Sequence, residues 1–143
     1  MGWPFPEAEG FSAYPKHVEG IPIRRKLERL QILHSIQGDR PPDGTRVGHY
    51  LVHYASGRSE EIPIIYGRDA RDWHELPDAP VGVTDAVIAW KGNNPAAKQA
   101  GNRGIRLFKS TWTNPAPDNE VATVDFVAEH VSACPFLVAL TAE

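Results

Sequence analysis

Prolines and glycines spaced along the whole chain limit most strongly what this sequence can fold into. Thirteen prolines and twelve glycines are spread over 143 residues. They separate short runs in which apolar and polar residues alternate. Proline removes a backbone donor and glycine weakens a helix, so this punctuation favours short strands joined by tight turns over long helices. The sequence therefore predicts an all-β fold.

The alternating runs predict individual strands, and each is bounded by turn residues. A β-hairpin is expected where the chain turns around Ser56-Gly57, because Gly57 can supply the positive φ of a tight turn. One turn of helix is expected near Arg25–Glu28, which leads into a strand. The predicted strands cover residues 29–36, the two arms of the hairpin over 46–67, and residues 82–92, 105–114, 120–129 and 135–142. This spacing predicts an antiparallel β-sandwich or jelly roll with at most one or two short helical turns.

The length of the chain fits one domain. Residues 1–20 are interrupted by Pro and Gly and predict an irregular lead-in. The domain is accordingly placed at residues 14–143, after a lead-in over residues 1–13. The polar stretch "GNNPAAKQAGNRG" predicts a long surface loop between two strands.

Charge and cysteine content exclude several classes of function. The net charge is −3, and the one basic cluster, Arg24–Lys26 with Arg29, is short and offset by Glu28. The sequence therefore predicts no nucleic-acid partner, because a phosphate-binding surface needs clustered cations. No apolar stretch approaches the ~18–20 residues of a membrane span, so no membrane insertion is expected. The single cysteine, Cys134, excludes an internal disulfide, and its apolar surroundings predict a buried, unreactive thiol. "MGWPFPEAEG" has neither a basic nor an apolar signal region, so no signal peptide is visible.

Histidines and carboxylates are the candidate sources of catalytic or metal-binding chemistry. His49 and His53 lie four positions apart in an alternating run, about 13 Å apart on a strand, which is too far to share a metal ion. Asp69 and Asp72 each adjoin an arginine. Neighbouring cations hold carboxylates ionised, which favours a salt-bridged turn over a general acid and base pair. No nucleophile elbow, P-loop or dinucleotide motif is present.

The tryptophans suggest a binding function. Trp73, Trp90 and Trp112 each end a strand or border a polar loop. An indole can stack on the apolar face of a sugar ring while Asp, Asn and Arg bind its hydroxyls. For Trp90 and Trp112 a core position is the competing interpretation. Asp125 interrupts a strand and is either held by structural hydrogen bonds or directed at a concave face.

Several stretches together resemble one family. In order along the chain they are "IPIRRKLERLQILHS", "VGHYLVHYASGRSEEIPIIYGRDARDW", "AVIAWKGNNP", "IRLFKSTWTNPAPDNEVATVDFV" and "CPFLVALTAE". The chain resembles, over residues 14–143, a bacterial β-sandwich domain with a galactose-binding-like jelly-roll fold. Such domains are attached to larger bacterial proteins, including glycoside hydrolases. The resemblance implies a non-catalytic domain that binds carbohydrate, other domains of a parent protein as partners, and an extracytoplasmic or cell-surface location.

The leading hypothesis is therefore a non-catalytic carbohydrate-binding module. The alternatives are a structural or protein-interaction domain without a small-molecule ligand and, third, a small hydrolase. No cofactor is expected, although the resemblance leaves open a structural Ca²⁺ at the loop residues Asp39, Asp43 and Asp118. The residues predicted to bind the ligand are Asp69, Arg71, Asp72, Trp73, Asn93, Asn94 and Arg106.

Overall fold

The computed structural model describes residues 16–75, 82–95, 104–130 and 132–143. Its elements are strands. They are β1 (His17–Arg25), β2 (Arg29–Gly38), β3 (Arg46–Tyr54), β4 (Ser59–Ile65), β5 (Ala86–Gly92), β6 (Ile105–Thr113), β7 (Val121–Ala128) and β8 (Ala133–Ala142).

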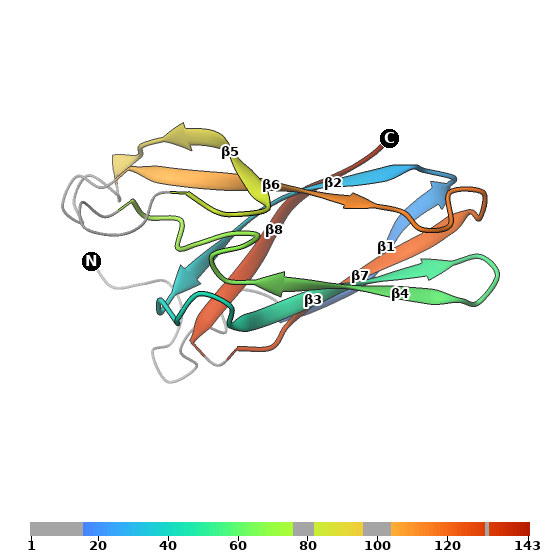
Figure 1. The fold of residues 1–143 in the computed structure, drawn as a ribbon, viewed down its shortest axis with the longest axis horizontal. Helices are drawn as coiled ribbons and strands as arrows, with labels where there is room; N and C mark the ends of the chain where they lie inside the picture. Colours follow the sequence, from blue (N-terminus) through green and yellow to red (C-terminus); the bar gives the residue numbers. More distant parts are fainter. Residues whose placement is uncertain (1–15, 76–81, 96–103, 131) are drawn as a thin grey trace.

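The strands form two four-stranded sheets packed as a sandwich (Figure 1). One sheet has the order β1-β7-β3-β4 and the other has the order β5-β6-β2-β8. All the strand pairs are antiparallel. The predicted all-β antiparallel sandwich is thus confirmed. Only β3–β4 and β5–β6 pair with their direct successors in the chain, so most connections cross from one sheet to the other.

Each strand predicted from alternation is present, as β2 to β8. The hairpin also turns as expected, because Gly57 has a φ of 93°. The lead-in predicted over residues 1–13 lies outside the described residues.

Two predictions near the start of the domain are wrong. The sequence predicted irregular structure up to residue 20, but β1 begins at His17. The pairing of β1 with β7 shifts register around Gly20. Pro22 is tolerated because β1 is an edge strand. The helical turn expected near Arg25–Glu28 is absent. Instead, Arg24 takes a φ of 54° and the chain bends directly into β2. Leu27, which had suggested helical spacing, is a buried core residue at this bend.

The core lies between the sheets and is built from alternate residues of the central strands. Leu30 and Ile32 of β2 and Tyr50 and Val52 of β3 belong to this core, and all four are fully buried. Cys134 is buried at the start of β8, and burial raises the pKa of its thiol. The predicted buried thiol is therefore confirmed, and its raised pKa disfavours the reactive thiolate.

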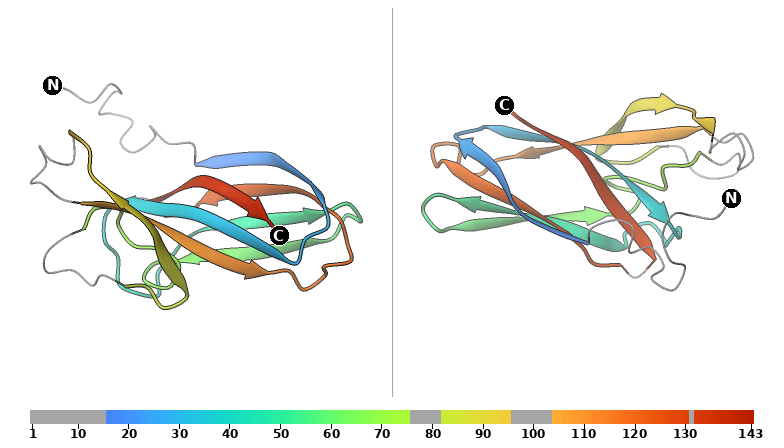
Figure 2. Two further views of the ribbon diagram at one scale, coloured as in Figure 1. Left: turned by 90° about the horizontal axis from the view of Figure 1, so that it is seen from above. Right: turned by 180° about the vertical axis from the view of Figure 1, so that it is seen from behind.

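Each sheet leaves two edge strands, and these edges decide where the sandwich is open. β1 and β8, the edges of different sheets, lie on the same side of the molecule, as the rear view in Figure 2 shows. β4 and β5 are the remaining edges. Hollows between the sheets occur along the β1–β8 side and beside β4.

Candidate functional site

The segment that follows β4 is built into the second sheet. The pairing of β2 with β6 ends at His34 and Phe108. Beyond that point the backbone of Trp73 lies between the two strands and hydrogen-bonds to both. Its N–H donates to the Ile36 carbonyl at 2.8 Å, and its carbonyl accepts from the Arg106 N–H at 2.8 Å. Residues 72–74 thus fill the gap between two diverging strands, which fixes the position of the charged residues around them.

Asp69 and Arg71 hold the turns of this segment together. The Asp69 carboxylate accepts from the Ile65 N–H at 2.8 Å and from the Arg68 guanidinium at 2.9 Å. The Arg71 guanidinium donates to both carboxylate oxygens of Asp43, at 2.7 and 2.9 Å, and to the Gly82 carbonyl at 2.7 Å. The hydrogen bonds from Arg71 hold the pKa of Asp43 below its ordinary value. The predicted salt-bridged turn is confirmed.

Asp72 and Arg106 are buried next to this turn. Asp72 accepts from the His74 N–H at 2.7 Å, and its carboxylate lies 3.6 Å from the Arg40 guanidinium. Arg106 donates to the Asp72 carbonyl at 3.2 Å, and burial lowers the pKa of its guanidinium. Together with neighbouring loop residues they border a small hollow of about 190 Å³. The hollow is lined by Arg40, Pro41, Pro42, Asp43, Tyr66, Arg71, Asp72 and Arg106.

The other predicted ligand-binding residues lie apart from this hollow. Trp73 is half-buried and packs edge-on against Phe136, with ring centroids 5.6 Å apart. Its indole Nε1 is buried and has no hydrogen-bond partner in the part of the chain that the structure describes. Asn93 and Asn94 follow β5, and the Asn94 N–H donates to the Asn93 side chain at 2.9 Å. The seven predicted residues therefore do not line one common pocket, and a ligand-binding role for them remains a prediction.

A second hollow beside β4, of about 220 Å³, combines an indole with charged groups. Trp112 lines it from β6 and is half-buried. Arg68 and Asp85 line it from two turns that are joined by a hydrogen bond from the Asp85 N–H to the Arg68 carbonyl at 2.9 Å. We call this hollow the Trp112 pocket. Its lining residues are Ile32, His34, Tyr50, Glu61, Ile62, Pro63, Arg68, Asp69, Asp85, Ser110, Thr111 and Trp112.

A buried hydrogen-bond chain stands behind the Trp112 pocket. His34 Nδ1 lies 2.7 Å from the Tyr50 hydroxyl, and His34 Nε2 lies 2.9 Å from the Ser110 hydroxyl. Ser110 donates to the Asp69 carbonyl at 3.2 Å. The directions are consistent when Tyr50 donates to Nδ1 of a neutral imidazole and Nε2–H donates to Ser110. Burial lowers the pKa of His34 to about 4, so the ring is neutral at pH 7.

Sequence reasoning missed Arg68, Asp85 and Ser110 as members of this pocket. They are far apart in sequence and meet only because the turn after β4 packs against β6. Of the predicted site residues, Asp69 alone lines this pocket. For Trp112 the sequence allows either a core or a site position. A signal was available in the alternation of "FKSTW", residues 108–112, which places Trp112 on the same strand face as the buried Phe108 and Ser110.

His49 and His53 each contact a carboxylate. His49 Nδ1 lies 2.6 Å from Glu129, and His53 Nε2 lies 2.7 Å from Asp125. Asp125 also accepts from the Gly20 N–H at 2.8 Å, which supports the structural interpretation of this residue. His49 and His53 therefore contact two different carboxylates. No group of three or more His, Cys, Asp or Glu side chains that could hold a metal ion occurs within residues 16–75, 82–95, 104–130 and 132–143.

Comparisons of the chain with protein-family models, with curated proteins and with solved structures found no match. Within the described part of the chain, no helix has the length and hydropathy needed to cross a membrane.

The hydrogen bonds of the Arg71 guanidinium should contribute more to stability than those of the neighbouring Arg68. We expect Arg71→Lys to lower the free energy of unfolding by about 2 kcal/mol, because an ammonium group cannot reproduce the paired bonds to Asp43 and the bond to Gly82. Arg68→Lys is the matched control and should cost less than about 1 kcal/mol, because the Arg68 side chain is 41% exposed. Urea unfolding of the two variants measures the difference. Equal losses would contradict this assignment.

Proposed function

We propose that this domain is a non-catalytic carbohydrate-binding module and that the Trp112 pocket is its ligand site. The observation that carries the proposal is the combination in one hollow of a half-buried indole with the charged groups of Arg68 and Asp85. Sugar recognition needs such a combination, since the ring offers an apolar face and a rim of hydroxyls.

The pocket is suited to a single sugar unit rather than to a larger ligand. Its volume is about 220 Å³, below the range of roughly 300–1,000 Å³ common for drug-sized ligands. Trp112 supplies the stacking surface. Asp85 is exposed and can accept hydrogen bonds from hydroxyl groups, while Arg68 can donate to them.

Hydrogen bonds within the protein hold the polar side chains of the Trp112 pocket in place before a ligand binds. Asp69 holds the Arg68 guanidinium through Nε at 3.1 Å and Nη2 at 2.9 Å, and the Pro63 carbonyl accepts from Nη2 at 3.2 Å. A side chain held in this way loses little further freedom when a ligand binds. The Ser110 hydroxyl is held in the same manner by its hydrogen bonds to His34 and to the Asp69 carbonyl.

A protein-interaction domain remains the second candidate, and one observation favours it. Val87 and Trp90 lie on the edge strand β5 and are 55% and 47% exposed. Large apolar side chains on a sheet edge are typical of a surface that contacts another protein or domain.

Removal of the Trp112 ring tests the proposal. We expect the domain to be retained by at least one neutral polysaccharide in affinity electrophoresis, and we expect Trp112→Ala to weaken retention at least about tenfold, because an aromatic stacking contact is worth about 1.4 kcal/mol or more in affinity. Trp90→Ala is the matched control and should leave retention unchanged.

The outcomes separate the two candidate functions. Retention that depends on Trp90 but not on Trp112 would move the ligand to β5 and contradict the proposed site. If a broad panel of soluble polysaccharides retains neither the domain nor its variants, the carbohydrate function is wrong and the protein-interaction candidate is favoured. A thermal melt of each variant shows that the fold is intact.

A further inference from the structure

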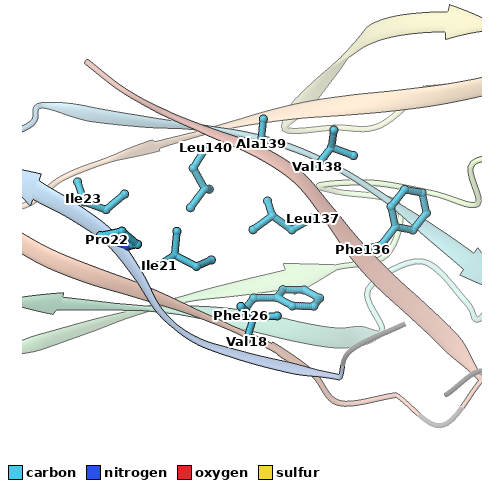
Figure 3. Close-up of a pocket in the computed structure, with 10 residues that line it drawn as sticks. All are labelled: Val18, Ile21, Pro22, Ile23, Phe126, Phe136, Leu137, Val138, Ala139 and Leu140. Atoms are coloured by element: carbon cyan, nitrogen blue, oxygen red, sulfur yellow. The ribbon is translucent and has the colours of Figure 1, made fainter. Parts of the chain in front are cut away.

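An apolar groove lies between β1 and β8. It has a volume of about 520 Å³, and no charged side chain lines it. Figure 3 shows Ile21 and Leu137 extending into the space from opposite sides. Phe126 of β7 lies between the two edge strands and is buried. The complete lining is Val18, Ile21, Pro22, Ile23, Phe126, Phe136, Leu137, Val138, Ala139 and Leu140.

The edges of the groove are poorly suited to pairing with another strand. The register of β1 shifts twice against β7, and β1 contains Pro22. The register of β8 also shifts against β2, next to the exposed Val138. Bulges and prolines on edge strands hinder strand addition. A small apolar ligand therefore fits this groove better than an added strand.

A basic cluster follows the last groove residue of β1 along the chain. Arg24, Arg25 and Lys26 directly follow Ile23, and all three side chains are exposed. None of them forms an ion pair with any residue that the structure describes. The nearby carboxylate of Glu143 is occupied, because it accepts from Arg29 and Gln31. The apolar groove is thus followed along the chain by three exposed cations, with one exposed carboxylate, Glu28, two residues beyond them.

We propose that this groove binds a monomeric fatty carboxylate. The acyl chain lies between β1 and β8, and the carboxylate meets Arg24, Arg25 and Lys26. From Val18 to Ile23 the groove follows β1 for roughly 16 Å at ~3.3 Å per residue, which suits an elongated chain rather than a compact ring. The volume of about 520 Å³ is in the range of small-molecule sites. This proposal is independent of the carbohydrate site, which lies beside β4.

Three probes with the same chain and different head groups test the proposal. Calorimetric titration would use dodecanoate, dodecanol and dodecyltrimethylammonium, each below its micelle concentration. We expect dodecanoate to bind most tightly and the cationic probe most weakly. The triple variant Arg24→Gly, Arg25→Ser, Lys26→Ser should weaken dodecanoate about tenfold, since each exposed ion pair contributes up to about 1 kcal/mol, and should leave dodecanol unchanged. Glycine is chosen at position 24 because Arg24 has a φ of 54°.

A groove-filling variant and a distant charge variant complete the experiment. Ile21→Trp should abolish binding of both dodecanoate and dodecanol, and Val18→Trp serves if the first variant does not fold. Arg58→Ser, which removes an exposed cation in the β3–β4 hairpin, should change nothing. Equal binding of all three probes, or binding that survives both groove-filling variants, would overturn the proposal. The proposal would also be overturned if light scattering showed that the ligand-free domain is a dimer and that Ile21→Trp makes it monomeric. The groove would then be a contact between two copies.

Discussion

Lowering the pH from 7 to 5 should reduce the free energy of unfolding by about 2 kcal/mol through His34 alone. Burial places the pKa of His34 at about 4, whereas the ordinary value is 6.5. Between these values the unfolded chain binds a proton that the folded protein excludes. The stabilisation that the neutral His34 gives to the folded state is therefore complete above pH 6.5. It falls as the pH decreases and is lost below pH 4. Urea unfolding at several pH values from 7 to 5 measures it.

The variant His34→Gln separates this effect from other titrations. It cannot titrate, so its stability should be lower at pH 7 but should change much less with pH. Carboxylates with lowered pKa, such as Asp43, Asp125 and Glu129, lose their contribution mainly below this window. If the wild-type protein and His34→Gln lose stability in parallel between pH 7 and 5, the conclusion that His34 is buried in its neutral form is wrong.

Gly38→Ala should cost about 4 kcal/mol or more and leave little folded protein at 37 °C. Gly38 ends β2 with a φ of 106°, and a Cβ there would lie 2.0 Å from the carbonyl oxygen of Ser132. That oxygen also accepts from the Asp39 N–H at 3.0 Å. A methyl group would therefore force apart the end of β2 and the chain that enters β8, in addition to straining its own backbone.

A second glycine isolates the effect of the close contact. Gly57 has a φ of 93°, but no atom lies within 4 Å of a Cβ built there. Gly57→Ala should therefore cost only the backbone strain, about 1–2 kcal/mol. Thermal unfolding of both variants gives the comparison. Similar melting temperatures would show that the approach of Ser132 to Gly38 is not as tight as described.

Alternation was enough to predict the strands whose side chains face a filled core. In β2, Leu30, Ile32 and His34 alternate with exposed or half-buried residues, and such a pattern is visible in the sequence. β1 was missed because bulges at Gly20 and beside Arg24 interrupt its period. A strand at an open edge buries little, so its sequence carries only a weak signal.

The site was harder to predict than the fold. Asp69, Arg71 and Asp72 lie within four residues of one turn, and from the sequence they could contact either a ligand or each other. The structure places them at most 7% exposed, with bonds to the backbone and to neighbouring charges. Which polar residue faces inward depends on how residues 72–74 pack between β2 and β6, a contact between distant parts of the chain. No local pattern encodes it.

The most direct test of the carbohydrate proposal is a nuclear magnetic resonance titration of the labelled wild-type domain. Soluble oligosaccharides from the retaining polysaccharide would be added while the backbone and indole N–H signals are followed. We expect the signals of Trp112, Thr111, Arg68 and Asp85 to shift together and to saturate. Shifts confined to Trp90 and Val87, or the absence of any saturable shift, would contradict a sugar site in the Trp112 pocket.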